Sequence, residues 1–597
     1  MQALKAREEM NSKDLWNLSN LYASDEAWEV SYEKALAEID KVGTYQGKLG
    51  ESAQLLEEAL TESNRIGGDV ARLYNYAGKR HHQDTTNPTY QAMESKAESL
   101  GVKAGTISSY MVPEILGIGE AKLQIFMKEN PALEIYAHYF HDIVRVADHI
   151  LTPEKEELMA QISEVAAAPG AIFSMINNAD LKFEPVADKD GEMRPLTHGN
   201  FIQHLESKDR VLRENAYNAF YAEFRKLRNT IAKTFSSSVK GTGFDAKVRN
   251  YGSSLEAALF GDNIPVDIYK NLVETVNDNL GLMHDYVSVR KNILGLDELK
   301  SYDLYVPIVE SGNINIDYDS AKETIIASLA PMGEEYLGLI KRAFDEQWID
   351  VYENKGKRPG AYSWGSYGTH PHILMNYDDR IKSMFTLTHE LGHALHSYYT
   401  GDNQPQVYGG YTIFLAEIAS TVNEALLMDY LLKTTKDENT KKYILNYYME
   451  NFRGTLFRQT MFAEFEMVTH QMDADNVPLT VDALNEVYKG LVEKYFGKDL
   501  VTDENIAHEW ARIPHFYRPF YVFQYATGFS SAIAISKAIL TEGQPAVARY
   551  VNSLLKGGSS DYSIEILKRA GVDMTTKAPI EAAMKVFGEV LAQFKGM

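Results

Sequence analysis

The chain has 597 residues, with 60 lysines and arginines against 83 aspartates and glutamates, a formal net charge of −23, and no cysteine. Hydrophobic residues make up 45% of it, which is typical of a globular protein rather than a disordered one. The absence of cysteine excludes disulfide scaffolds, cysteine-ligated metals and thiol nucleophiles. The acidic balance disfavours nucleic acid and anionic membranes as partners. Because the chain has no cysteine, any bound metal must be held by His, Asp or Glu.

The N-terminal sequence lacks the apolar stretch of a signal peptide, and no segment offers the ~18 uninterrupted apolar residues that a membrane span requires. We therefore expect a cytoplasmic protein without a membrane partner. The sequence does not predict the oligomeric state.

Apolar residues recur at helical spacing over long stretches, for example 28–45, 268–293 and 413–432. A strand signal interrupts this pattern at 181–186 and 193–196, with Asp190-Gly191 between the two runs, which predicts a hairpin with a tight turn. Because this hairpin separates a helical N-terminal region from the rest, we predict a domain at residues 1–196 and a second at 197–597. The predicted fold class is mainly α.

Glycine, proline and aromatic residues dominate residues 355–368, and the residues that follow, His372 to Tyr377, are typical of a short strand. An extended segment can pair with the backbone of a bound peptide as an added strand. We therefore predict that His372, Ile373 and Leu374 bind substrate.

The strongest motif is His389-Glu390-Leu391-Gly392-His393. On a helix, residues i and i+4 lie about 40° apart around the axis and about 6 Å apart along it. The two imidazoles can therefore close on one zinc ion, while Glu390 can reach a zinc-bound water without becoming a ligand. This predicts Glu390 as the general base that acts on zinc-activated water. The alternative, from these five residues alone, is a helix with surface histidines.

A catalytic zinc usually has a third protein ligand. The metzincin pattern is excluded because Tyr399 stands at its third-ligand position. His396 lies on the same helix face but too far along the axis, so we interpret it as a supporting or core residue. Glu417 is the first acid of the next helical segment, where a buried carboxylate is costly unless it is paired or metal-bound. Glu424 lies about two turns later and is predicted to accept the second N–H of a zinc-bound histidine; alternatively, both acids form a polar stripe.

These segments resemble a known family. THELGHALHS and FLAEIASTVNEALL are similar to the zinc site of the thimet-oligopeptidase family of metallopeptidases, in its oligoendopeptidase F branch. The resemblance extends from GAYSWGSYGTHPHILMNY to IPHFYRPFYVFQYATGFSSA and covers at least residues 360–530. It implies one zinc per chain, bound by His389, His393 and Glu417, with Glu390 as the general base. It also implies two helical lobes that enclose a deep substrate channel, with a small sheet next to the zinc site.

The resemblance implies a second group of catalytic residues. The family places a histidine and tyrosines over the zinc, where they hydrogen-bond the oxyanion, and His515, Tyr521 and Tyr525 match them. Pro519 suits the first turn of a helix, which predicts both tyrosines on one helix face. The spacing after the histidine is one residue longer than in thimet-type members, and Gly528 stands where they have a further tyrosine, so which tyrosine donates is open. By spacing alone, such aromatic residues are more often core.

The implied function is a zinc-dependent endopeptidase that hydrolyses internal bonds of short unstructured peptides in intracellular peptide turnover. Two alternatives stay open. A zinc exopeptidase, such as a carboxypeptidase, can use the same ligands, and a helical peptide-binding protein can keep the fold without the chemistry. The presence of every zinc-site residue argues against the second alternative.

Overall fold

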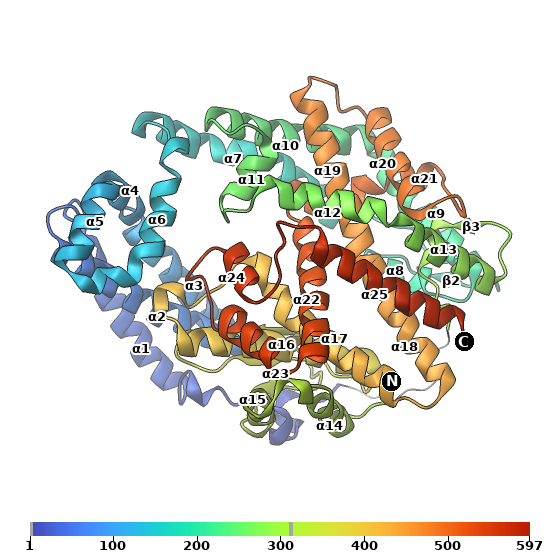
Figure 1. Cartoon of the computed structure of the whole chain (residues 1–597), viewed down its shortest axis with the longest axis horizontal. Coiled ribbons are helices and arrows are strands. Elements are labelled where there is room, and N and C mark those ends of the chain that lie inside the picture. The colour runs from blue at the N-terminus through green and yellow to red at the C-terminus, as the bar shows by residue number, and fades with distance from the viewer. Residues whose placement is uncertain (1–3, 310–314) are drawn as a thin grey trace. The chain divides into compact units, whose positions relative to one another are not determined.

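The computed structural model describes residues 4–309 and 315–597 and is mainly helical, as predicted (Figure 1). Residue contacts divide the chain into two compact units, each built from three segments. Unit 1 comprises Met1–Asp148, Ile314–Tyr430 and Ile535–Val572; unit 2 comprises His149–Asn313, Leu431–Ala534 and Asp573–Met597. Two helices, α17 and α22, contain residues of both units. The division of the sequence at 196/197 stays a prediction.

The helices that start in unit 1 are α1 (Asp25–Glu38), α2 (Ala53–Gln83), α3 (Pro88–Ser108), α4 (Met111–Ile118), α5 (Glu120–Glu129), α6 (Ala137–Arg145), α14 (Tyr318–Ser328), α15 (Glu334–Asp345), α16 (Ile381–Asn403), α17 (Ile413–Thr434), α23 (Gln544–Arg549) and α24 (Ser563–Arg569). Its strands are β4 (Ile349–Asp350), β5 (Tyr362–Trp364) and β6 (His372–Leu374).

The helices that start in unit 2 are α7 (Pro153–Met175), α8 (Phe201–Leu205), α9 (Arg210–Lys226), α10 (Arg228–Val248), α11 (Ser254–Phe260), α12 (Val266–Asp278), α13 (Leu280–Leu294), α18 (Glu438–Asn451), α19 (Arg458–Ala474), α20 (Val481–Phe496), α21 (Glu504–Ala507), α22 (Phe523–Glu542) and α25 (Ala578–Lys595). Its strands are β1 (Val186–Ala187), β2 (Met193–Arg194), β3 (Leu299–Lys300) and β7 (Leu500–Val501).

Local residues explain where several elements begin and turn. The Ser52 hydroxyl accepts the N–H of Leu55 and so caps α2, a helix of 31 residues. The predicted hairpin is present, because β1 and β2 pair antiparallel. Its turn contains Gly191 at φ +80°, a left-handed conformation that glycine adopts without a steric penalty.

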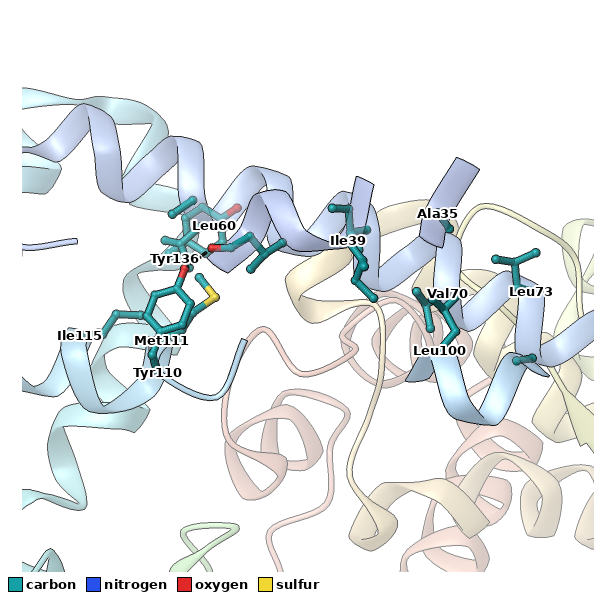
Figure 2. Close-up of a cluster of buried hydrophobic side chains, with 14 of the residues drawn as sticks. Ala35, Ile39, Leu60, Val70, Leu73, Leu100, Tyr110, Met111, Ile115 and Tyr136 are labelled. Carbon is teal, nitrogen blue, oxygen red and sulfur yellow. Dashed lines mark hydrogen bonds between the residues drawn. The ribbon is translucent and has the colours of Figure 1, made fainter. Parts of the chain in front are cut away.

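A hydrophobic core of unit 1 runs along α2 (Figure 2). Leu60, Val70 and Leu73 from this helix belong to it together with Leu100 from α3. Full burial of one such side chain contributes roughly 1.5–3 kcal/mol. Leu374 of β6 belongs to the same cluster and is fully buried. The core therefore anchors the strand that precedes the zinc-motif helix.

The sheet of unit 1 corrects one prediction. The strand at His372–Leu374 is present as β6, but it is the central strand, parallel to β4 on one side and antiparallel to β5 on the other. Both of its edges are hydrogen-bonded, and the side chains of His372, Ile373 and Leu374 are fully buried. The prediction that these three residues bind substrate is therefore wrong.

The buried His372 has a structural partner set instead. Its Nε2–H donates to the carbonyl of Asn17 at 2.9 Å, and its Nδ1 accepts from Lys79 Nζ at 2.9 Å. Burial lowers the pKa of both His372 and Lys79 well below their ordinary values. Lys79 also donates to the carbonyl of Trp364 at 2.8 Å, so α2 fixes the strand β5.

Among the residues that the structure describes, one helical stretch of unit 2, Pro153–Asp180, is long and apolar enough by length and composition to cross a membrane. Its most apolar window has a mean hydropathy of 1.3, and 11% of that window is buried. Gln161, Glu164 and Pro169 lie within this stretch, so it does not contain ~18 uninterrupted apolar residues. The absence of a membrane partner stays a prediction.

Candidate metal centre

Helix α16 places the two motif histidines side by side. Their ring centroids are 4.7 Å apart and their Nε2 atoms are 3.1 Å apart. The helix begins after Arg380, and Asp379 just before it has φ +59° and turns the chain. His389 and His393 therefore both lie within the helix, at positions i and i+4.

Three ligand atoms converge in unit 1. Glu417 Oε2, on α17, lies 3.3 Å from the Nε2 atoms of both His389 and His393. A tetrahedral zinc with bonds of about 2.0–2.1 Å separates its ligand atoms by about 3.3 Å. The three separations therefore match one face of a zinc tetrahedron, and these residues form the metal-ligand group found among the described residues.

The three ligand side chains are partly exposed, which leaves a fourth coordination position accessible. The exposed fractions of the side chains are 28% for His389, 18% for His393 and 38% for Glu417. Structural zinc sites are closed by four protein ligands, whereas catalytic sites keep one position for water or substrate. Three ligands with this exposure therefore fit a catalytic zinc rather than a structural one.

Glu424 orients the first histidine. Its Oε1 lies 2.5 Å from His389 Nδ1, and because a carboxylate only accepts, Nδ1 carries the proton and Nε2 is free to bind metal. Without metal, burial disfavours the charged imidazole, but hydrogen bonds to Glu417 and Glu424 raise the pKa of His389 to about 10. A metal ion bound at Nε2 would therefore replace a proton on that nitrogen. Glu424 therefore contacts the ring nitrogen of His389 that faces away from His393, and its role in orienting a zinc-bound histidine stays a prediction.

The two carboxylates nearest the histidines differ in their surroundings. Burial alone would raise the pKa of Glu417, but hydrogen bonds with His389 and His393 hold it well below its ordinary value. The Ser420 hydroxyl also donates to Glu417 Oε2 at 3.2 Å. Glu390 is only 7% exposed, and burial raises its pKa. Glu417 thus suits a metal ligand, whereas Glu390 suits a group that takes up a proton.

Gly392 explains how Glu417 reaches the histidines. A Cβ added at Gly392 would lie 2.5 Å from Ser420 Cα and 2.6 Å from the carbonyl oxygen of Ala419. These are backbone atoms of α17, so only a residue without a side chain permits this approach of the two helices (α16 and α17 in Figure 1). The carboxylate is brought to the imidazoles by this close contact.

His396 is a core residue, as the sequence analysis interprets it. It is fully buried, and its ring stacks on that of Tyr411, with centroids 3.7 Å apart and an angle of 6° between the ring planes. Burial lowers the pKa of His396 to about 3, so the ring is neutral. It is not part of the ligand group.

The three residues assigned to the oxyanion lie close together in unit 2. The rings of His515 and Tyr521 are nearly parallel, with centroids 6.2 Å apart. The ring of Tyr525 is edge-on to both, with its centroid 6.1 Å from that of His515 and 5.6 Å from that of Tyr521. Their proximity does not come from one helix face, because α22 begins at Phe523, after Tyr521. The prediction that Pro519 starts this helix is therefore wrong; a turn brings the two tyrosines together.

Comparison with known proteins identifies the family. The profile of peptidase family M3 matches residues 203–586, and the oligopeptidase F profile matches residues 114–183. The chain belongs to peptidase family M3. Oligopeptidase PepF of Bacillus subtilis is 48% identical over 592 residues, which cover 99% of this chain and 88% of PepF. The oligoendopeptidase F homolog of Lactococcus lactis subsp. lactis is 39% identical over 592 residues, 99% of this chain and 98% of the homolog.

A solved structure supports the same assignment for the fold. Oligoendopeptidase-F from Enterococcus faecium matches with a TM-score of 0.74 at 38% identity and covers 96% of this chain and 99% of that chain. Together with the ligand group, these matches identify a zinc metalloendopeptidase of the oligopeptidase F branch that hydrolyses oligopeptides. The exopeptidase and the non-enzymatic peptide-binding protein are both excluded by this assignment.

Some residues that support this M3 metal centre were missed by sequence reasoning. Gly392 is one of them: a glycine inside a helix costs up to ~1 kcal/mol and usually has a packing reason, which is the signal in the sequence that could identify it. No sequence pattern indicates that the Ser420 hydroxyl donates to Glu417. Asn423 joins the two helices by donating to the carbonyl of Thr388 at 3.4 Å, and its Oδ1 accepts from Tyr336 at 2.8 Å.

Proposed function

We propose that this M3 peptidase cleaves internal bonds of short unstructured peptides in the cytoplasm, with His389, His393 and Glu417 as zinc ligands and Glu390 as general base. The observation that carries the proposal is the convergence of three ligand atoms at separations of 3.1–3.3 Å, two from α16 and one from α17, next to Glu390 of α16. Surface histidines on an ordinary helix have no reason to share a carboxylate from a second helix.

When bound, zinc lowers the pKa of a coordinated water toward about 7 and polarises the scissile carbonyl. Glu390 takes the proton of the attacking water, since its pKa is raised toward the range in which a general base works best. The same carboxyl then delivers this proton to the leaving amine. We propose that His515 and either Tyr521 or Tyr525 donate hydrogen bonds to the oxyanion. Their clustered rings and the family resemblance support this role.

We propose β5 as the strand that pairs with the substrate, in place of β6. The N–H of Ile373 bonds to the carbonyl of Trp348, so the backbone of Ile373 faces β4 and that of its neighbours faces β5. Ser363, which lies opposite Ile373, therefore directs its N–H and C=O away from β6. These groups offer a peptide backbone the two hydrogen bonds of an added strand.

The strand proposal is tested with backbone-modified peptides. N-methylation of the substrate amide that pairs with Ser363 should raise KM about 5-fold, the equivalent of one hydrogen bond of ~1 kcal/mol. Methylation of the next amide, which points the other way, is the control. Equal effects at both positions, or none at any position scanned, would contradict pairing at β5.

The central experiment combines zinc quantification with Glu390→Gln kinetics. The variant should retain one zinc per chain and lose at least ~100-fold in kcat, because general-base catalysis typically contributes 10²–10⁴-fold. Glu346→Gln is the matched control, since Glu346 bonds to Arg342 of α15 and to the indole N–H of Trp348, and to no member of the metal-ligand group. Near-full activity of zinc-loaded Glu390→Gln would refute the mechanism.

Substrate size is a separate part of the proposal. An internally quenched peptide with both ends blocked should be cut, whereas a folded protein that contains the same sequence in a loop should not. Cleavage of the folded protein at a similar rate would contradict a restriction to short unstructured peptides. We also propose residues 1–196 and 197–597 as domains; the profile boundaries at 183 and 203 support this, and limited proteolysis between them tests it.

A further inference from the structure

A buried carboxyl group in unit 2 contacts the chain segment that carries the proposed oxyanion residues. Glu466 of α19 is 1% exposed, and its Oε1 accepts the backbone N–H of Phe520 at 2.8 Å. Phe520 has φ +57°, a left-handed conformation that is uncommon for a residue with a large side chain. Such a conformation persists only where the surroundings hold it. The hydrogen bond from Phe520 to Glu466 is one of those constraints.

The side chain of Phe520 is held as well. It is 2% exposed, and His470, one turn after Glu466 on α19, packs against it with ring centroids 4.5 Å apart. Tyr269 of α12 lies edge-on at 5.8 Å. The backbone and the ring of Phe520 are therefore both fixed, and α19 contributes to both contacts.

The surroundings of Glu466 favour the neutral form of its carboxyl group. Burial raises its pKa well above the ordinary value, and the Phe520 N–H opposes this only in part. Its Oε1 accepts a backbone N–H, and its Oε2 has no hydrogen-bond partner among the described residues. The group is thus a hydrogen-bond acceptor in this contact rather than a counter-ion, which an uncharged amide can imitate.

The turn at Phe520 sets where the next residue points. Tyr521 follows directly and lies outside α22, so helical geometry does not fix its direction. Its ring nevertheless lies 5.6 Å from Tyr525, which is inside α22, and 6.2 Å from His515. The left-handed residue between His515 and α22 is what turns the chain into this arrangement.

We propose that Glu466 is a positioning residue: it holds Phe520 in the left-handed conformation and thereby aligns Tyr521 with His515 and Tyr525. The inference rests on the proposed function, in which one of these tyrosines donates to the oxyanion. Glu466 is not a member of the metal-ligand group, and in this proposal it acts through its contact with the turn.

The test compares two substitutions of the same residue. Glu466→Gln keeps a neutral oxygen acceptor at this position and should retain kcat within about 3-fold, a change close to 0.6 kcal/mol in the barrier. Glu466→Met has a similar length without an acceptor and should lower kcat by up to ~100-fold, the loss expected when a catalytic group is displaced by about 1 Å. KM should change much less than kcat, because the loss concerns the transition state. Zinc content should stay at one per chain in both variants.

Two further measurements separate a positioning role from a merely structural one. Glu464→Gln is the matched control: Glu464 is two residues away on α19 and bonds to Lys494 and Tyr495, not to the turn. It should alter stability without lowering kcat. Hydrogen exchange of the peptide that contains the Phe520 amide should be slow in the native enzyme and in Glu466→Gln, and faster in Glu466→Met.

The outcomes distinguish this proposal from the proposed function. Full kcat in a folded Glu466→Met enzyme, an equal loss in Glu466→Gln, or unchanged exchange at Phe520 would each overturn the role of Glu466. Tyr521→Phe and Tyr525→Phe are measured in parallel. If neither lowers kcat, the oxyanion assignment is wrong, whereas the exchange data still decide whether Glu466 holds the turn.

Discussion

Gly392 is the position at which one added methyl group tests the metal centre most directly. In Gly392→Ala, the Cβ would meet Ser420 Cα at 2.5 Å, the Ala419 carbonyl oxygen at 2.6 Å and Ser420 N at 2.7 Å. Non-bonded carbon atoms prefer about 3.5–4.0 Å, so the two helices must separate by about 1 Å at this point. All three contacts are with backbone, and no side-chain rotation can relieve them.

The displacement should reach the zinc ligands. Glu417 is on the same helix, less than one turn before Ser420, whereas ligand distances in a working site hold within about ±0.2 Å. Overpacking of this kind costs typically 1–3 kcal/mol. If that cost falls on the metal-bound geometry, zinc affinity drops about 10–100-fold, since each 1.4 kcal/mol is tenfold.

The assay is competition for zinc with a chelator, together with thermal unfolding of the apo and zinc-loaded protein. Gly401→Ala is the matched control, because Gly401 is in the same helix and has no neighbouring atom within 4 Å of its would-be Cβ. It should leave zinc affinity unchanged and stabilise the protein by up to ~1 kcal/mol. If Gly392→Ala binds zinc as tightly as the native chain, the close approach of α16 and α17 is not what brings Glu417 to the histidines.

Three further predictions concern Glu424, Gly78 and Glu466. Glu424→Gln should weaken zinc binding about 10–100-fold in chelator competition, because an amide holds His389 less firmly in the metal-binding tautomer; unchanged affinity would contradict this. Gly78→Ala should destabilise the protein by about 1–3 kcal/mol in urea unfolding, since its Cβ would lie 2.7 Å from the Trp364 ring. Glu466→Gln should gain stability over the native enzyme as pH rises, by at most ~1.4 kcal/mol per pH unit, because the raised pKa makes the folded state retain a proton that the unfolded state releases; a difference independent of pH would refute it.

The metal ligands could be predicted from sequence because their relationships are local. His389 and His393 are related by one helical repeat, which fixes their geometry before any tertiary contact forms. Glu417 and Glu424 stand on the next helix, where few other acids compete for the role. Burial of a carboxylate in an apolar stretch was a sufficient physical reason to link Glu417 to a cation.

The substrate strand could not be predicted in the same way. β4, β5 and β6 contain only two or three residues each. Such strands are too short for an alternation of apolar and polar residues to indicate which faces are buried. Which of them is central depends on pairing between segments that the sequence keeps apart. The sequence located a strand at His372–Leu374 but carried no information that β5 and β4 cover both of its edges.

The turn before α22 shows the same limit in another form. Spacing suggested one helix face for Tyr521 and Tyr525, since Pro519 resembles a helix start. The chain instead adopts a left-handed conformation at Phe520, which no propensity predicts for phenylalanine. It is held by Glu466, 54 residues earlier in the sequence. The two tyrosines therefore come together for a reason that only the tertiary structure contains.

The zinc ligands are therefore close together in the sequence, whereas the residues that hold the neighbouring sheet in place are far apart in it. Lys79 and Asn75 of α2 fix β5 through the carbonyls of Trp364 and Gly365, across 285 and 290 residues. Because these contacts lie outside the motif, a chain can retain His-Glu-x-x-His and Glu417 and still lose β5, the edge strand that we propose as the substrate strand. A homologue with substitutions at these α2 positions should therefore bind zinc normally and show its defect in KM. A parallel loss of zinc would mean that α2 supports the ligands themselves, not only the strand.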